Sequence, residues 1–316
     1  MMRSLAWLAL LATSPVLAAE PAATPQLPHT LPATMEHHRF FVDAQAPGGK
    51  TLRLFTDSGG GMNLTTRGAD KLGLSYDKDN NLGSEHEPVY GVTTWPTYAG
   101  PWIPPPKSAD VKLAIMPGPA WMHDGMLGTA WFGDRTWEWD YRAGTLRLLP
   151  DGALPEAEPA HVVQLGFQAD ADGRHTTHFP RIPARIDGED LQFLFDTGAT
   201  FRLDEAAAAR LGDASVRQRA GNFITREVMQ RWRERHPDWP YIEKGDGGMA
   251  MIQVPAVEIA GYTTGPAWFS ERPDRAFHEF MAQWMDMPVD GALGGETFRG
   301  FRITVDYPGA TAVFER

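Results

Sequence analysis

Two short motifs in this sequence place a carboxylate, a hydroxyl and a glycine in the same order. They are Asp57-Ser58-Gly59 and Asp196-Thr197-Gly198, and each follows a run rich in apolar residues. Two carboxylates held close together cannot both ionise easily, so they share one proton. One can then act as a general base towards water while the other acts as a general acid. A single Asp in a turn is usually structural, so this chemistry requires a fold that brings both motifs together.

The two motifs belong to a duplicated unit. Residues 50–73 align without a gap with residues 189–212 at an offset of 139, with seven of 24 positions identical. Residues 125–148 align in the same way with residues 291–314 at an offset of 166. Because both matches run in the same order, we predict two copies of one unit, the second with 27 extra residues between its two windows. A pseudo-two-fold axis between the copies would bring Asp57 and Asp196 face to face.

Each motif is expected between a strand and a short helix. Apolar residues alternate before each Asp, which predicts a strand entering a core, and the following Gly-rich turn needs backbone freedom. A helix is expected next in each copy, capped by Thr65 or Thr66 in the first and by Asp204 in the second, and ended by Gly73 or Gly212. Residues 136–149 and 301–314 predict β-hairpins. Inside the second copy we expect an amphipathic helix over 277–285 and a solvated helix over 225–235.

Composition excludes several classes of protein. The 316 residues contain no Cys and carry a formal net charge of −11. The chain therefore has no disulfide, thiolate metal site or Cys nucleophile, and nucleic acid is not expected as a partner. It contains no HExxH, Gly-x-Ser-x-Gly or phosphate-binding loop motif, so we predict neither a metal site nor a cofactor. The 32 Gly and 26 Pro residues indicate a turn-rich, β-rich chain.

The N-terminus has the pattern of an export signal. Arg3 precedes an apolar run from Leu5 to Leu17, which is followed by small residues of the kind that a signal peptidase reads. The alternative is a membrane anchor, although the run is short for a bilayer. We predict a signal peptide at 1–18, a flexible leader at 19–35, lobes at 36–150 and 164–316 and a linker at 151–163. The mature chain is expected in the periplasm or outside the cell, without stable membrane insertion.

The sequences LFTDSGGG (54–61) and FLFDTGAT (193–200), followed downstream by GMLG and GALG, resemble the aspartic protease superfamily. Locally they are most similar to retropepsin-like bacterial proteases, whereas two copies on one chain resemble the bilobal pepsin arrangement. The resemblance implies a mainly β fold of two homologous barrel-like lobes with a few short helices and an active-site cleft between them. It also implies hydrolysis of an extended peptide or protein by Asp57, Asp196 and a water, without a cofactor. Two copies on one chain make a monomer the expected state.

The resemblance also assigns supporting roles. Ser58 and Thr197 would donate hydrogen bonds across the lobe interface, and the backbone N–H groups of Gly59 and Gly198 would face the carboxylates. Structural support beneath the two turns would come from Leu127, Gly128, Leu293 and Gly294. A flap over the substrate would carry Tyr90 and Gly91 at its tip, although an ordinary surface loop explains these two residues equally well.

Three positions depart from the family pattern. Thr56 stands where a large apolar residue is usual, and Gly60 and Ala199 stand where pepsin-like enzymes commonly carry Ser or Thr. A missing hydroxyl donor destabilises the ionised carboxylates, so we expect a raised pKa and a pH optimum less acid than that of pepsin.

These departures leave two other functions open. One is a catalytically inactive, pepsin-like module that binds peptides or acts like an inhibitor. The other is a carbohydrate- or envelope-binding β protein that uses some of the 11 Trp residues. Five of these Trp residues are instead expected in cores, because several of them lie on periodic patterns; they are Trp131, Trp137, Trp139, Trp268 and Trp284.

Overall fold

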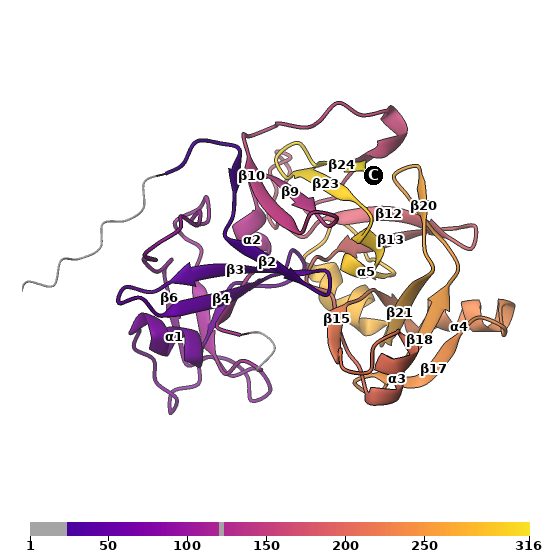
Figure 1. The fold of residues 1–316 in the computed structure, drawn as a ribbon, viewed down its shortest axis with the longest axis horizontal. Coiled ribbons are helices and arrows are strands. Elements are labelled where there is room, and N and C mark those ends of the chain that lie inside the picture. The colour runs from indigo at the N-terminus through magenta and orange to yellow at the C-terminus, as the bar shows by residue number, and fades with distance from the viewer. Residues whose placement is uncertain (1–23, 120–122) are drawn as a thin grey trace, which may run out of the picture.

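The computed structural model describes residues 24–119 and 123–316, and it is built mainly from β-strands. Each half of the chain forms a lobe around its own sheet, and a third sheet joins the two (Figure 1). In Figure 1 the indigo and purple elements of the first half lie on the left, and the orange elements of the second half lie on the right. The predicted fold class, two related β lobes with a few short helices, is confirmed.

The first lobe contains a seven-stranded sheet. Its inner strand β4 (Thr51–Thr56) alternates in burial over its first half, with Leu52 and Leu54 in the core and Thr51 at the surface, and is wholly buried at its end. The alternation is the pattern that a half-buried strand requires. The other strands, with the sheet order β2-β3-β4-β8-β5-β7-β6, are β2 (Ala33–Glu36), β3 (Arg39–Gln45), β8 (Gly125–Leu127), β5 (Asn63–Thr65), β7 (Leu113–Met116) and β6 (Gly91–Thr93).

The second lobe contains a nine-stranded sheet with the same central arrangement. Strand β13 (Glu189–Phe195) takes the place of β4, and it pairs in parallel with β22 (Gly291–Leu293) as β4 pairs with β8. The remaining strands are β17 (Tyr241–Asp246), β18 (Met249–Val254), β21 (Ala267–Arg272), β16 (Phe223–Thr225), β12 (Arg181–Ile186), β19 (Val257–Ile259) and β20 (Tyr262–Thr264). A separate two-stranded sheet consists of β14 (Thr200–Arg202) and β15 (Gln218–Ala220).

The joining sheet carries the pseudo-two-fold axis. Its strand order is β1-β10-β9-β23-β24-β11, so each half supplies three strands in mirrored order. At its centre, Glu138 pairs with Thr304, its own equivalent at the offset of 166. The pseudo-two-fold rotation maps the residue pair on one side of Glu138 and Thr304 onto the pair on the other side, so the two hairpins are related by this symmetry. The strands are β1 (His29–Thr30), β10 (Thr145–Leu149), β9 (Thr136–Asp140), β23 (Arg302–Asp306), β24 (Thr311–Glu315) and β11 (Val162–Gln164).

The helices are short and pack against inner strands of the two lobe sheets, α1 (Thr66–Leu72) against β5 and α4 (Arg226–Arg235) against β16, for example. Thr65 caps the first of them by accepting a hydrogen bond from the Gly68 N–H, and Asp204 caps the third by accepting one from the Ala207 N–H, as predicted. The other helices are α2 (Thr129–Phe132), α3 (Glu205–Arg210) and α5 (Gly295–Phe298), with 3₁₀ or π turns at η2 (Pro159–His161), η3 (Ala276–Phe280) and η4 (Met281–Gln283).

The structure corrects the alignment of the two copies after the aspartates. Strand β5 pairs antiparallel with β8 and in parallel with β7, and β16 pairs in the same way with β22 and β21. Leu64 is therefore equivalent to Ile224, 160 residues later, and not to Leu203. The offset between the two copies thus rises from 139 at the aspartates to 160 at Leu64 and Ile224. The difference shows that 21 of the 27 extra residues directly follow the second turn. This segment, residues 200–220, forms β14, α3 and β15, so the helix equivalent to α1 is α4 and not α3.

Several other expectations are wrong in part. Within the predicted flexible leader, β1 pairs with β10 and the start of β2 pairs with β3, and Leu31 between the two strands is buried. The predicted linker at 151–163 ends in η2 and the first residues of β11. Helix α4 is not merely solvated, since Trp232 is fully buried on its inner face together with Val228 and Met229.

The amphipathic helix expected over 277–285 is also wrong as a single helix. A π turn, η3, gives way there to a 3₁₀ turn, η4, so a spacing of 3.6 residues does not hold. Phe277 and Met285 are buried, but Phe280 and Trp284 are exposed. Of the five Trp residues expected in cores, the other four are buried.

The predicted signal peptide, residues 1–18, lies outside the described residues. Among the residues that the structure describes, no helix is long and apolar enough to cross a membrane.

Candidate active site

The two aspartates lie at equivalent positions, one directly after β4 and the other directly after β13. Each backbone N–H is fixed by the neighbouring parallel strand. Asp57 N donates to Leu127 O at 3.0 Å, and Asp196 N donates to Leu293 O at 2.8 Å. The predicted supporting residues Leu127 and Leu293 therefore hold the start of each turn through their carbonyl groups, and their buried side chains fill the core below.

The structure brings the two carboxyl groups together across the pseudo-two-fold axis. They hydrogen-bond to each other, and each also accepts from the backbone of its own turn. Gly59 N donates to Asp57 Oδ1 at 2.9 Å, and Gly198 N donates to Asp196 Oδ1 at 3.0 Å. Two carboxyl groups in hydrogen-bond contact require a shared proton.

Both turn glycines are needed because the opposite carboxyl group fills the space of a side chain. A Cβ at position 59 would lie 2.6 Å from Asp196 Cγ, and one at position 198 would lie 2.1 Å from Asp57 Cγ. A side chain would also clash at the predicted glycines Gly128 and Gly294. A Cβ at position 128 would lie 2.0 Å from Gly61 O, and one at position 294 would lie 2.5 Å from Gly221 O. The turns can pack face to face only with glycine at these positions.

Reciprocal hydrogen bonds lock the two turns together. Ser58 N donates to Thr197 Oγ1 at 3.1 Å, and Thr197 N donates to Ser58 Oγ at 3.0 Å. The Ser58 hydroxyl also donates to Phe195 O of the opposite lobe at 2.7 Å. Both side chains are fully buried, so water cannot replace these bonds. Ser58 donates through its hydroxyl across the lobe interface, whereas Thr197 Oγ1 accepts there.

Replacing Ser58 by alanine is expected to destabilise the protein by about 2–3 kcal/mol. The change leaves the buried Thr197 N–H and the Phe195 carbonyl without the partner that the hydroxyl supplies, and each unsatisfied group costs about 1–3 kcal/mol. Chemical denaturation of Ser58→Ala and of Ser108→Ala, a surface control, measures the difference. Equal midpoints for both variants would contradict the role assigned to this hydroxyl.

Burial raises the pKa of both aspartates. For Asp57 desolvation is the main cause, partly offset by hydrogen bonds from Asp196 and from the Gly59 N–H. For Asp196 desolvation is followed by repulsion from Asp57 and the hydrogen bond to it, and its pKa is raised well above the ordinary value. The two raised pKa values mean that the pair holds one shared proton and one negative charge. Neither Gly60 nor Ala199 supplies a hydroxyl donor that would lower these pKa values.

The carboxyl groups open into a cavity of about 230 Å³. Its remaining walls come from the second lobe: Gly198, Ala199, Thr200, Arg202, Phe223 and Arg272. Thr56, the departure just before the first aspartate, does not disturb the site, because its hydroxyl donates to Phe40 O at 3.0 Å. The site therefore has both acid–base groups and space for a small part of a substrate next to them.

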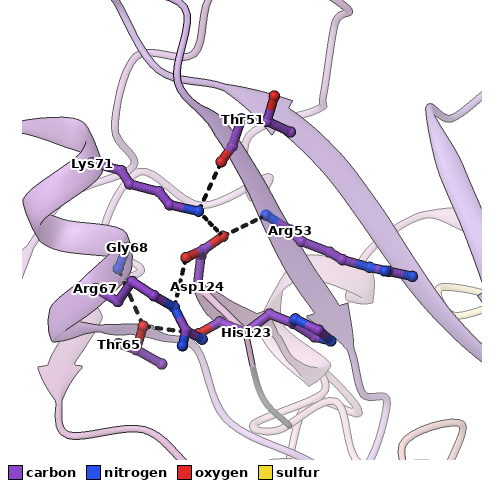
Figure 2. Close-up of polar contacts among 8 residues, drawn as sticks. All are labelled: Thr51, Arg53, Thr65, Arg67, Gly68, Lys71, His123 and Asp124. Carbon is purple, nitrogen blue, oxygen red and sulfur yellow. Dashed lines mark hydrogen bonds and ion pairs between the residues drawn. The ribbon is translucent and has the colours of Figure 1, made fainter. Parts of the chain in front are cut away.

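A buried aspartate that sequence reasoning missed joins the strand before the first turn to the helix that follows the turn (Figure 2). Asp124 accepts from Arg53 N of β4 at 2.8 Å and from Lys71 Nζ at 2.8 Å, and its own backbone oxygen accepts from Thr65 N at 3.0 Å. Arg67 Nε adds a further bond at 3.0 Å. Figure 2 shows the Asp124 carboxylate between the helix that carries Lys71 and Arg67 and the strand that carries Arg53.

The second lobe repeats part of this arrangement with Asp290. It accepts from Gln192 N at 2.8 Å, and its backbone oxygen accepts from Thr225 N at 2.8 Å. The signal was present in the sequence, since both aspartates directly precede the aligned glycines Gly125 and Gly291. They ensure that the strands beneath both candidate catalytic turns keep the same register.

The flap candidates lie in the first lobe, away from the turns that carry the aspartates. Tyr90 N donates to Ile115 O at 2.7 Å, and Gly91 begins β6, the edge strand of the seven-stranded sheet. The preceding loop reaches towards the second lobe, where Glu87 lines a cavity of about 590 Å³ together with Phe280 of η3. The structure does not bring Tyr90 into the cavity of the aspartates, and a flap at this loop stays a prediction.

Comparison with known proteins gives structural resemblance without sequence relatives. No protein-family model matches the sequence, and no curated protein matches it. One similar solved structure is conglutin gamma, a basic 7S globulin from lupine seeds, at 9% identity and a TM-score of 0.46, covering 91% of this chain and 95% of that chain. Another is a retropepsin-like aspartic protease from Rickettsia conorii, at 15% identity and a TM-score of 0.27, covering 48% of this chain and 86% of that chain.

Proposed function

We propose that this protein is an aspartic endopeptidase. The observation that carries the proposal is the contact between the Asp57 and Asp196 carboxyl groups, at equivalent positions of two lobes and open to a cavity. Structural aspartates in turns do not need a second carboxyl group in hydrogen-bond contact, because burying such a pair costs free energy. A pair with one shared proton fits a reaction that needs a base and an acid together.

In the proposed mechanism the ionised Asp57 removes a proton from a water molecule, whose oxygen attacks the carbonyl carbon of the peptide bond. Protonated Asp196 donates its proton to the carbonyl oxygen, which gives a neutral tetrahedral diol. Asp57 then transfers its proton to the amide nitrogen as the C–N bond breaks, and the diol returns a proton to Asp196. The products are a carboxylic acid and an amine, and the pair regains its starting protonation.

The extended substrate would lie between the lobes, with Tyr90 and Gly91 as the proposed flap. Because each half of the chain supplies one aspartate, a monomer is sufficient for the site. We also propose the predicted lobes at 36–150 and 164–316 as the two units, and export to the periplasm or the medium as the location. No cofactor takes part in this mechanism.

The pH dependence of cleavage tests the proposal. Activity requires one proton on the pair, so it falls at low pH as Asp57 is protonated and at high pH as Asp196 ionises. Since burial raises the pKa of both groups, we expect a bell-shaped profile with an optimum above about pH 3, and cleavage that persists above the ordinary range of Asp carboxyl groups. The measurement uses the purified mature chain and a denatured protein substrate between about pH 3 and pH 7.

An optimum below about pH 3 would contradict the raised pKa values. Absence of cleavage over the whole range would favour the inactive peptide-binding module. Stabilisation against heat by a peptide analogue with a hydroxyl in place of the scissile carbonyl would then show whether the cleft binds peptides at all. Stabilisation by envelope glycans, without stabilisation by peptides, would favour the carbohydrate-binding function.

A further inference from the structure

Two arginines line the same cavity as the two aspartates. Arg202 lies on β14, at the start of the 21-residue insertion that the first copy lacks, and Arg272 lies at the end of β21. The first lobe contributes only Asp57 to this cavity. A chain with a formal net charge of −11 thus places two cations in the space beside its candidate catalytic carboxyl groups.

Arg272 is held in a fixed position. Its Nη2 donates to the buried Asp246 at 2.8 Å, its Nη1 donates to Ser270 Oγ at 2.7 Å, and its guanidinium carbon lies 3.8 Å from the centre of the Phe223 ring. The side chain is 20% exposed. Within the described residues, Nε–H and one N–H of Nη2 have no recorded acceptor. A guanidinium group fixed in this way can bind a carboxylate with little loss of side-chain entropy.

Arg202 is anchored through its backbone and leaves its charge available. Its N–H donates to Asp246 Oδ1 at 2.6 Å, so the same buried aspartate positions both arginines. The Arg202 side chain is exposed and forms no ion pair within residues 24–119 and 123–316. Because Arg272 already neutralises Asp246, Arg202 is a cation without a counter-ion in this cavity.

The paired aspartates do not serve as that counter-ion. Their pKa values are governed by burial, by each other and by backbone N–H groups, with no contribution from either arginine. Among the described residues, neither guanidinium group forms a hydrogen bond or ion pair with Asp57 or Asp196. A negatively charged group of a substrate could contact them without displacing the shared proton.

We propose that the cavity formed by Arg202 and Arg272 binds a carboxylate of the peptide substrate close to the cleaved bond. This inference rests on the proposed peptidase function and specifies its substrate class. The carboxylate is either the side chain of Asp or Glu or the C-terminal carboxylate of the peptide. Both have the planar, bidentate geometry that a guanidinium group recognises.

The test compares peptides that differ only in this charge. Glu and Gln are placed in turn at the residues flanking the cleaved bond in peptides with a blocked C-terminus, and a second pair compares a free C-terminal acid with its amide. At one position we expect the Glu peptide to have a kcat/KM roughly 10-fold or more above that of the Gln peptide, the range of a charge-assisted hydrogen bond. A preference only in the second pair would identify the terminal carboxylate as the ligand.

The variant Arg202→Gln removes the free cation without leaving Asp246 unpaired. The preference for the charged peptide is expected to fall to about a third or less of its wild-type value, whereas Arg174→Gln, which removes an exposed arginine in a distant loop, is expected to retain it. Equal kcat/KM for charged and neutral members of both pairs, or a preference unchanged in Arg202→Gln, would overturn the inference.

Binding separates this inference from the proposed chemistry. Peptide analogues with a reduced, non-cleavable bond are titrated into the wild-type protein by calorimetry, again as charged and neutral pairs. Tighter binding of the charged analogue without any cleavage would support the carboxylate site and reject the peptidase function. Cleavage without charge preference in rate or in binding would support the peptidase and reject the carboxylate site. If no analogue binds, the carboxylate site is rejected as well.

Discussion

Replacing either Asp57 or Asp196 by asparagine is expected to lower kcat/KM for peptide cleavage by at least about 10³-fold. In the proposed mechanism the two carboxyl groups act as one unit, because the base and the acid exchange roles during each turnover. Acid–base catalysis contributes about 10²–10⁴-fold for each group, and losses in such a unit are not additive. The double variant is therefore expected to lose little more than either single variant, which a cleavage assay at the wild-type pH optimum can measure.

The control for this loss is the stability of the same variants. A carboxyl group whose pKa is raised in the folded state contributes stability below its unfolded pKa and loses it as the pH rises through the folded pKa. At pH 7 the raised pKa of Asp196 therefore costs the folded state free energy relative to the unfolded state. Asp196→Asn removes this cost, since asparagine cannot ionise. At pH 7 we expect the variant to be more stable than the wild type by about 1–2 kcal/mol, or a Tm higher by roughly 2–4 °C, with a smaller difference near pH 4.

Residual activity close to that of the wild type in either variant would contradict the proposed acid–base pair. A variant that is inactive and also less stable at pH 7 would point to a structural role for the aspartates instead. Inactivity combined with increased stability is the result that a functional pair predicts, because groups arranged for catalysis are held at a cost to the folded state.

The largest expected effect on stability comes from Asp124. Its carboxylate is 3% exposed and joins β4, α1 and the start of β8 through Arg53 N, Arg67 and Lys71. Replacing it by alanine leaves a buried N–H without an acceptor and two cations without their partner, at a cost of about 3 kcal/mol, or roughly 6 °C in Tm. Thermal unfolding followed by circular dichroism measures the change.

The pH dependence of the stability lost on replacing Asp124 distinguishes a contribution from its ion pairs from a contribution of side-chain packing alone. Burial alone would raise the pKa of Asp124, but hydrogen bonds from Lys71, the Arg53 N–H and Arg67 outweigh it, and the pKa is lowered. A lowered pKa contributes stability above the unfolded pKa and loses it as the pH falls through the folded value. The difference between wild type and Asp124→Asn should therefore shrink below about pH 4.

The matched control is Asp70→Asn on the surface of α1, where the Asp70 carboxylate accepts a hydrogen bond from the Tyr76 hydroxyl. We expect its effect to stay within about 0.5 kcal/mol. A loss of stability for Asp124→Ala no larger than that for Asp70→Asn would show that the Asp124 contacts between β4 and α1 do not stabilise the fold.

Local pattern was sufficient to predict much of the scaffold. Alternating apolar residues before each aspartate predicted β4 and β13, and Asp204 and one of the two candidates in the first copy, Thr65, cap helices as predicted. These features depend on neighbours in sequence, such as the N–H groups that a cap satisfies or the face that a strand buries. The π turn at η3 was missed because its hydrogen-bond spacing leaves no distinct pattern of residue types.

The alignment of the two copies failed where equivalence depends on pairing between distant strands. Leu64 and Leu203 match in the ungapped sequence, but the strand partners identify Ile224 as the counterpart of Leu64. Sequence identity at a fixed offset cannot detect that 21 residues were inserted directly after the second turn. That insertion carries Arg202. The ungapped alignment therefore also hid that the second lobe supplies arginines to the cavity and the first lobe does not.

The sequence alone thus determined the duplication, the position of one Asp-hydroxyl-Gly turn in each copy and the need for glycine in both turns. Only the tertiary structure decided that the two carboxyl groups touch, that Ser58 and Thr197 exchange hydrogen bonds, and that Arg202 and Arg272 share a cavity with the aspartates. The reason is physical. Residue types and local spacing specify turns and strands, whereas contacts between groups 139 residues apart depend on how the joining sheet rotates one lobe against the other.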